Sequence, residues 1–205
     1  MGLLYLLSIT FISARDNRLI YLGESMKAII ITGDLATGKS TFANIISKRF
    51  NVLLLTKDHL KEVLSDRIGF SNREENLKLS KASMHIMFYA LENANNSNTN
   101  IILEANFHQE EIDYLKKYKD DVLVLNLYGN EEILFKRFIN RIENENRHKV
   151  HLSIGLNDLA SFSSYIKKSR DVDFKGLEVI SIDATNFSYQ NDEDLFTKIS
   201  NFLNR

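Results

Sequence analysis

The sequence predicts an α/β fold, in which a five-stranded parallel sheet carries helices on both faces. Three observations lead to this prediction. Short apolar, β-branched runs alternate with longer amphipathic segments along the chain, as successive βα units require. A glycine-rich turn joins the first apolar run to a helical pattern, and a length of 205 residues fits one domain with a sizeable core. The predicted strands are residues 28–32, 51–56, 101–103, 122–127 and 177–182.

The predicted helices rest on apolar residues that recur every three or four positions. The longest pattern runs over residues 75–94, where Leu77, Met84, Met87 and Leu91 share one stripe. Polar residues 95–100 read as a loop, and residues 143–151 form a charged segment. The remaining helical patterns cover residues 42–48, 59–68, 109–118, 131–142, 161–169 and 192–203.

The composition is that of an ordinary globular protein, with 44% hydrophobic and 26% charged residues. A formal net charge of −1 argues against a surface given over entirely to nucleic acid, although a local basic patch remains compatible with it. The chain has no cysteine, which excludes disulfides, a thiol nucleophile and the usual zinc sites.

We divide the chain into an N-terminal extension, residues 1–25, and a domain formed by residues 26–205. The apolar stretch 3–12 is too short to span a bilayer, and it lacks the basic region and cleavage site of a secretory signal. The extension either carries no chemistry or forms a hairpin that turns at residues 15–17, because both flanks are apolar and partly β-branched. Neither interpretation supports secretion, so we expect a cytoplasmic protein without membrane association.

Residues 33–41 read Gly-Asp-Leu-Ala-Thr-Gly-Lys-Ser-Thr, a complete phosphate-binding loop between a strand and a helix. Its glycines let successive backbone N–H groups turn toward one anion, and the helix N-terminus adds its positive end. Lys39 is expected to reach the β- and γ-phosphates, and the Ser40 hydroxyl to hold Mg²⁺. The plain alternative is an ordinary glycine turn before a helix. The predicted nucleotide contacts are Gly33, Leu35, Ala36, Thr37, Gly38, Lys39, Ser40 and Thr41.

Polar residues follow the second predicted strand, at the sheet edge where open parallel sheets bind their ligands. Asp58 is placed to accept the proton of an incoming hydroxyl, and Lys61, one helical turn further on, is expected to face the same way. The alternative for Asp58 is a helix N-cap, a role that Asp favours and that is compatible with catalysis.

The third predicted strand ends in a second polar group. Glu104 follows the apolar run and is placed to hold the water shell of a magnesium ion, while Asn106 is placed to orient a substrate. The alternative is a polar strand end whose side chains form only loop hydrogen bonds.

Two arginines lie on one helical face after the fourth strand. Arg137 and Arg141 are four residues apart, and Arg147, His148 and His151 follow in the charged segment. Arginines supplied by a closing lid stabilise the charge of a transferring phosphoryl group and can contribute roughly 10³–10⁵ in rate. The alternative is a solvated face on which nearby glutamates pair with these cations.

In this order, the motifs resemble those of the small phosphate-loop (P-loop) kinases. Within them the chain is most similar to the group called "AAA family ATPase" that is close to polynucleotide 5′-kinase, chloramphenicol phosphotransferase and zeta-toxin kinases. The resemblance covers about residues 26–186. It rests on the phosphate loop, Lys57-Asp58-x-x-Lys61, Glu104-Ala105-Asn106-Phe107 and Arg137-x-x-x-Arg141 with Arg147-His148.

The resemblance implies a three-layer P-loop NTPase fold with strand order 2-3-1-4-5 and an arginine-bearing lid. It also implies an aspartate base at Asp58 and adenine contacts around residues 183–186, among them Thr185. Residues 66–76 resemble a block of an uncharacterised bacterial branch, which places Asn72 and Arg73 at the acceptor site; a polar inter-helix loop is the alternative. Lys61 stands where arginine is usual, and a lysine cannot make bidentate phosphate contacts.

We therefore expect an ATP- and Mg²⁺-dependent kinase that acts on a hydroxyl of a small molecule. Asp58 would be the base, and Lys39, Arg137 and Arg141 would stabilise the transferring group. The residues expected to contact the substrate are Lys61, Arg73, Glu104 and Asn106. A polynucleotide 5′-hydroxyl kinase and a P-loop ATPase or nucleotide switch without an acceptor remain alternatives. Nucleic acid is a possible but not a favoured partner, and the sequence does not define an oligomeric state.

Overall fold

A computed structural model of the chain describes residues 11–12, 19–20, 25–144 and 147–205. Its central feature is a sheet of five parallel strands in the order β4-β5-β3-β6-β7. Along the chain this is the order 2-3-1-4-5, so the expected sheet and fold class are confirmed, whereas the arginine-bearing lid stays a prediction. The strands are β3 (Ala28–Gly33), β4 (Leu53–Thr56), β5 (Ile101–Glu104), β6 (Val122–Tyr128) and β7 (Glu178–Asp183).

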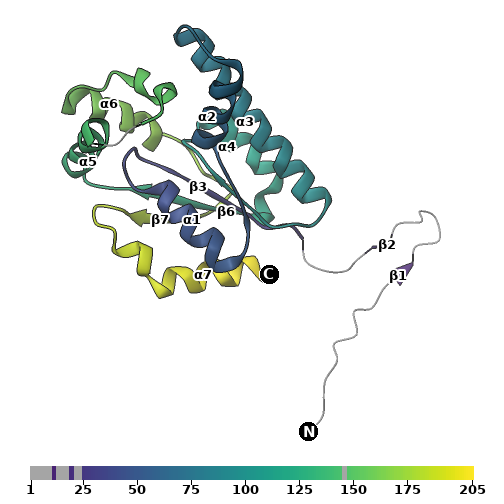
Figure 1. Cartoon of the computed structure of the whole chain (residues 1–205). Helices are drawn as coiled ribbons and strands as arrows, with labels where there is room; N and C mark the ends of the chain where they lie inside the picture. The colour runs from purple at the N-terminus through teal and green to yellow at the C-terminus, as the bar shows by residue number, and fades with distance from the viewer. Residues whose placement is uncertain (1–10, 13–18, 21–24, 145–146) are drawn as a thin grey trace.

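Helices cover both faces of this sheet (Figure 1). α1 and α7 lie on one face, α2, α3 and α4 on the other, and α5 and α6 stand together at one end. Their bounds are α1 (Lys39–Phe50), α2 (Lys57–Ile68), α3 (Arg73–Asn96), α4 (Gln109–Leu115), α5 (Glu131–Asn144), α6 (Leu159–Arg170) and α7 (Glu193–Leu203).

The central strand β3 is buried along its whole length, which explains its continuous apolar sequence. Successive side chains of a strand point to opposite faces, so β3 contributes to two cores. Ile29 and Ile31 pack into the cluster that includes α1 and α7, while Ala28 and Ile30 pack into the one formed with α3 and α4. In register, Ala28 pairs with Ile101 of β5 and with Val122 of β6, and this aligns the carboxyl ends of the three strands.

A third, smaller core lies beside the phosphate loop. Leu134 and Phe138 of α5 pack with Phe162 and Ile166 of α6, and Ala36 of the loop belongs to the same cluster. The helices at the end of the sheet are thus in direct contact with the segment that leaves β3.

The helix expected over residues 109–118 is wrong in its last part. α4 ends at Leu115, and Lys116–Asp121 form the 3₁₀ helix η1, because Tyr118 has the non-helical angles φ −111° and ψ 24°. Two further 3₁₀ helices, η2 (Lys149–Ile154) and η3 (Ser188–Asn191), lie in segments for which no helix was expected.

In the N-terminal segment, β1 (Phe11–Ile12) pairs with β2 (Leu19–Ile20) in antiparallel fashion. The turn predicted at 15–17 lies outside the described residues, and the role of residues 1–25 stays a prediction. Among the described residues, no helix has the length and apolarity needed to cross a bilayer.

The packing of α3 gives a matched stability prediction. Leu91 is fully buried in the core, whereas Leu77 on the same helix is 53% exposed. Leu91→Ala should lower the free energy of unfolding by about 2–5 kcal/mol, since it leaves a cavity. Leu77→Ala should change it by less than about 0.5 kcal/mol. Urea denaturation of both variants checks this, and equal losses would contradict the assigned packing.

Candidate functional site

A cleft of about 880 Å³ opens at the carboxyl ends of the strands. The phosphate loop forms one wall. α2 and the first turns of α3 form the opposite wall, and α5, α6 and residues 147–151 close the side.

The cleft brings together most of the residues predicted from the sequence. Gly33 and Thr185 do not line it: Gly33 lies behind the loop, and Thr185 lies in the segment after β7. Those that line it are Leu35, Ala36, Thr37, Gly38, Lys39, Ser40, Thr41, Asp58, Lys61, Arg73, Glu104, Asn106, Arg137 and Arg141.

The phosphate loop has a backbone that only a few residue types tolerate. Gly33 has φ +120°, and a Cβ atom there would lie 2.0 Å from the carbonyl oxygen of Leu127. Gly38 has φ +86° and directly precedes α1. The glycines are therefore required by the close approach of β6 and by left-handed backbone.

Side chains donate hydrogen bonds to the backbone carbonyls of the phosphate loop. Lys39 Nζ lies 2.6 Å from the Asp34 carbonyl oxygen and 3.1 Å from that of Gly33. From outside the loop, the Tyr189 hydroxyl donates a hydrogen bond of 2.6 Å to the Thr37 carbonyl. Burial lowers the pKa of Lys39, and Glu104, Asp58 and Asp34 act in the opposite direction. An arriving phosphate would provide the anion that this desolvated ammonium lacks.

Ser40 and Glu104 form a second polar group beside the phosphate loop. The Ser40 hydroxyl donates to Glu104 Oε2 over 3.1 Å, across the gap between α1 and β5. Burial raises the pKa of Glu104 to about 7, while the charge of Lys39 lowers it. A hydroxyl and a carboxylate are hard oxygen ligands of the kind that Mg²⁺ prefers, so the donor set fits this ion.

Asp58 lies in the first turn of α2, and Thr56 occupies the N-cap position. The N-cap alternative for Asp58 is therefore wrong, and its carboxylate remains available to the cleft with 63% of its side chain exposed. His151 Nδ1 is 4.0 Å from Asp58 Oδ1, and His151 Nε2 is 2.9 Å from Glu62 Oε1. Buried His151 thus lies between two carboxylates of α2.

The same helix contributes two amines. Lys57 and Lys61 both line the cleft, and burial lowers the pKa of each, with the charge of Asp58 acting the other way. Within the described part of the chain, no carboxylate lies within ion-pair distance of either amine. Among the residues that the structure describes, the one hydrogen bond of Lys61 Nζ is to the Val150 carbonyl, at 3.4 Å.

Asn106 also lines the cleft. In the half of the cleft that α2 borders, its Oδ1 atom is buried and has no hydrogen-bond partner among the described residues. Tyr165 of α6 lies beside Asn106, and its pKa is raised by burial and then by the Asp58 carboxylate. Arg73, at the start of α3, is exposed and lines the mouth. This half therefore presents cations, an unpaired acceptor oxygen and the Asp58 carboxylate.

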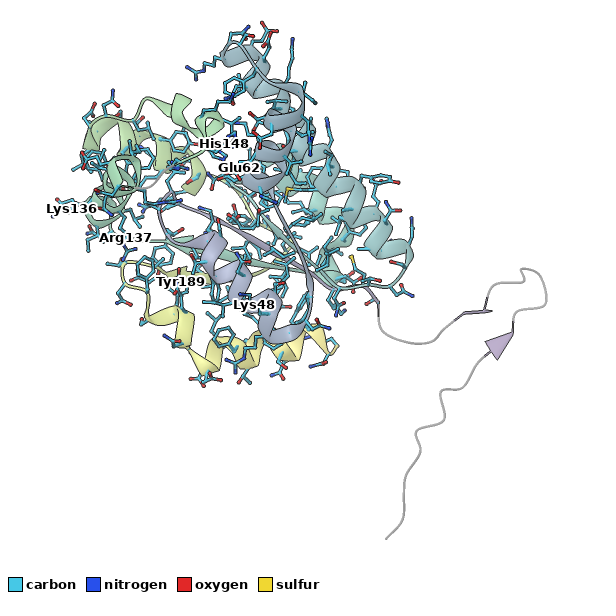
Figure 2. All side chains as sticks on the ribbon, in the orientation of Figure 1. Lys48, Glu62, Lys136, Arg137, His148 and Tyr189 are labelled. Carbon is cyan, nitrogen blue, oxygen red and sulfur yellow. The ribbon has the colours of Figure 1, made fainter. Side chains whose placement is uncertain are left out.

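The two predicted arginines differ in their surroundings. Arg137 donates to the carbonyls of Ala184 and Thr185, each over 2.7 Å, and its guanidinium lies 4.0 Å from the centre of the Phe187 ring. Arg141 lies close enough to Lys39 and Glu104 to lower the pKa of both. Figure 2 shows Arg137 directed toward the segment that carries Tyr189, with neighbouring Lys136 pointing outward.

The segment after α5 is attached to α2 by histidine–carboxylate contacts. His148 Nε2 lies 3.0 Å from Asp66 Oδ1, one helical turn beyond the contact of His151 with Glu62. His148 and Glu62 accordingly lie on facing elements (Figure 2). These contacts close the side of the cleft next to Asp58.

Among the lining residues to which the sequence assigned no role are Lys57, Tyr165, Phe187 and Gln190. Only Lys57 has a sequence signal, because it stands directly before Asp58 at the end of a strand. Tyr165, Phe187 and Gln190 come from segments far along the chain, and only the fold brings them to the site.

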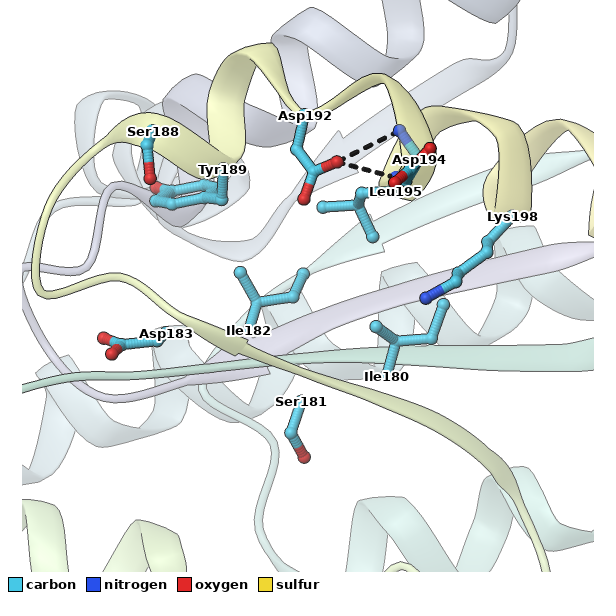
Figure 3. A pocket seen from close by; sticks show the side chains of 10 residues that line it. All are labelled: Ile180, Ser181, Ile182, Asp183, Ser188, Tyr189, Asp192, Asp194, Leu195 and Lys198. Carbon is cyan, nitrogen blue, oxygen red and sulfur yellow. Dashed lines mark hydrogen bonds between the residues drawn. The ribbon is translucent and has the colours of Figure 1, made fainter.

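A second hollow of about 540 Å³ lies between β7 and α7 (Figure 3). Asp192 caps α7 there by accepting hydrogen bonds from the backbone of Asp194 and Leu195. With Asp183, Asp192 and Asp194 in its wall and Lys198 as its one lysine, this hollow is unsuited to a polyphosphate.

The raised pKa of Glu104 generates a pH prediction for the protein without nucleotide or Mg²⁺. Between pH 4.5 and about 7 the folded state keeps a proton that the unfolded state releases. The free energy of unfolding should therefore fall as pH rises through this window. Glu104→Gln should remove that loss. Across the window, the free energy of unfolding of the variant should therefore rise by roughly 3 kcal/mol relative to that of wild type. Urea denaturation at a series of pH values measures this, and parallel curves would contradict it.

Several solved structures share this fold. A candidate kinase from Chloroflexus aurantiacus is 22% identical and gives a TM-score of 0.70, with 87% of this chain and 98% of that chain covered. Shikimate kinase from Aquifex aeolicus gives 14% identity and a TM-score of 0.55, covering 87% and 99%. The tunicamycin resistance protein of Deinococcus radiodurans is 16% identical and gives a TM-score of 0.58, with 85% of this chain and 95% of that chain covered.

No curated protein matches the sequence. The narrower similarity to polynucleotide kinase, chloramphenicol phosphotransferase and zeta-toxin kinases is not established by these comparisons. A family model described as "AAA domain" matches residues 29–158, which is more than half of the chain. The chain therefore belongs to this AAA domain family of nucleotide-binding P-loop proteins, and it has the fold of the P-loop kinases.

Proposed function

We propose that the protein is an ATP- and Mg²⁺-dependent phosphotransferase that phosphorylates a hydroxyl group of a small molecule. The observation that carries this proposal is the presence of Asp58, a carboxylate with 63% of its side chain exposed, in the same cleft as the phosphate loop. A nucleotide switch needs no such carboxylate opposite its phosphates, whereas a kinase uses one to accept the acceptor's proton. Because the reaction consumes ATP, we also propose a cytoplasmic location.

At the nucleotide end, loop N–H groups and Lys39 would bind the β- and γ-phosphates. Ser40 and Glu104 would hold Mg²⁺, which supplies charge neutralisation of the phosphate oxygens when bound. Arg141, which lies near Lys39, would stabilise the negative charge that spreads over the transferring group. Arg137 would join it only after exchanging its two carbonyl partners, which ties this predicted role to a movement of residues 184–185.

At the acceptor end, Asp58 would orient the hydroxyl and take its proton as the new oxygen–phosphorus bond forms. The bond to the bridging oxygen of ADP breaks, and ADP leaves with the electron pair. His151, held by Glu62, lies beside Asp58 and would support its orientation. Most of the rate gain would come from positioning and charge stabilisation.

The lining of the acceptor end favours a particular class of acceptor. Lys57, Lys61 and Arg73 line the cleft together with Asp58, and the two partly buried lysines are stabilised by an anionic partner. Asn106 Oδ1 offers an acceptor for one more hydroxyl. We propose a polyol that also carries a carboxylate or phosphate group. A polynucleotide 5′-end has the same chemistry, and the screen below distinguishes it.

Two substitutions separate nucleotide binding from transfer. Lys39→Ala should abolish nucleotide-dependent activity with any acceptor, since it removes the cation that meets the phosphates. Asp58→Asn should keep the Kd for ATP within about twofold, while kcat falls by roughly 10²–10⁴. Calorimetry gives the Kd, and acceptor-dependent ADP release gives kcat. Transfer by Asp58→Asn at the wild-type rate would refute the base assignment.

A screen of matched acceptors tests the proposed class. Sugars, the corresponding sugar acids and sugar phosphates, and oligonucleotide 5′-ends are compared by acceptor-dependent ADP release. We expect the sugar acids or sugar phosphates to react best, and Lys61→Met to raise KM for them about tenfold, because a charge contact is lost. Lys78→Met, on the exposed face of α3, is the control. A preference for neutral sugars, or an equal KM rise for neutral and anionic acceptors, would overturn the assignment.

A further inference from the structure

The phosphate loop contains a buried carboxylate that the proposed reaction does not use. Asp34 follows Gly33, and only 1% of its surface is exposed. Its backbone shapes the loop: Asp34 N donates to the Leu127 carbonyl, and the Asp34 carbonyl accepts from Lys39 Nζ and Thr37 Oγ1. Any displacement of Asp34 would therefore move the lysine that meets the phosphates.

A carboxylate at this position works against the purpose of the loop. The loop gathers N–H groups and a lysine to attract an anion, and a negative charge behind them opposes the same anion. Burial makes the opposition stronger, because little water is present to screen the charge. The loop can hold a triphosphate tightly only if the charge of Asp34 is neutralised.

Arg170, the last residue of α6, provides this neutralisation. Its Nη2 and Nε lie 2.7 Å and 3.0 Å from Asp34 Oδ2. Nη2 also donates to the Gly129 carbonyl over 2.8 Å, and Nη1 lies 2.9 Å from Glu131 at the start of α5. One guanidinium thus connects the phosphate loop, the turn after β6 and both helices at the end of the sheet.

The carboxylate has two weaker partners besides Arg170. The Gly129 N–H lies 3.3 Å from Asp34 Oδ2, and the Ser169 hydroxyl lies 3.3 Å from Oδ1. Both are neutral donors, which an asparagine oxygen could also use. The only described cation bonded to the carboxylate is Arg170.

We propose that Arg170 is a positioning residue of the nucleotide site, which neutralises Asp34 and fixes the phosphate loop to α6. It does not line the cleft and acts through Asp34. Affinity for the triphosphate therefore depends on a charge behind the loop. Nucleotide binding and the placement of α6, which carries Tyr165 at the acceptor end, are coupled through this pair.

The test compares ATP with adenosine, which has no phosphate, by calorimetry. Arg170→Met leaves Asp34 as an unpaired buried charge, and we expect it to weaken ATP binding at least about tenfold more than adenosine binding. The double variant Asp34→Asn/Arg170→Met removes both charges and keeps the neutral donors. We expect it to restore the Kd for ATP to within about fivefold of wild type. Arg49→Met, which removes the exposed Arg49–Glu193 pair on α1, should leave the Kd unchanged.

Thermal unfolding of each variant separates this role from a purely structural one. If Arg170→Met is destabilised but loses ATP and adenosine affinity equally, the pair only stabilises the fold and the proposal is wrong. It is also wrong if the double variant recovers stability without recovering ATP affinity. Should Arg170→Met not fold, Arg170→Lys carries the test: a lysine keeps the charge but not the fork of contacts, so ATP affinity should fall about three- to tenfold. Wild-type affinity in Arg170→Lys would show that the charge alone suffices and would overturn the part of the proposal in which the fork of contacts fixes the loop to α6.

Discussion

The site depends on one steric constraint, the contact between Gly33 and the backbone of β6. A Cβ atom at Gly33 would lie 2.0 Å from the Leu127 carbonyl oxygen, so only glycine fits at this last position of β3. Its φ of +120° also favours glycine. Two neighbouring contacts then set the direction of the loop: Asp34 N bonds to Leu127, and Lys39 folds back over the Asp34 carbonyl. These contacts hold the loop at the carboxyl end of β3, where it lines the cleft.

Around this point the protein places charges that are costly to bury and that partly offset each other. Lys39 and Glu104 are each nearly buried, and burial pushes the pKa of the lysine down and that of the glutamate up. Each opposes the shift of the other without cancelling it. In the proposed function, a nucleotide phosphate and a magnesium ion would add the charges that lower the cost of burying this pair.

The sequence predicts the fold and one end of the site well, for local reasons. The strand–loop–helix pattern places the phosphate loop, and the rule that ligands bind at carboxyl ends of parallel strands places Asp58 and Glu104 opposite it. The structure places both carboxylates in the cleft with the loop, because each follows directly from a strand, and their roles stay predictions. The ion pair between Asp34 and Arg170 joins residues 136 positions apart, so no local pattern could reveal it. The 3₁₀ turn at Lys116–Asp121 was missed because helix periodicity does not report backbone angles such as those of Tyr118.

Arg137 shows which features of the site the spacing of a motif can predict and which it cannot. Its distance of four residues from Arg141 correctly puts both arginines in one cleft, but spacing does not say which acceptors they meet. Arg137 holds two backbone carbonyls after β7 and stacks on Phe187, so its charge already has partners on the nucleotide side of the cleft. Arg141 lies near Lys39 and Glu104, where the transferred phosphoryl group would lie. The two arginines therefore differ in their contacts: Arg137 is bonded to the segment around residues 184–187, whereas Arg141 lies near Lys39 and Glu104, and their catalytic roles stay predictions.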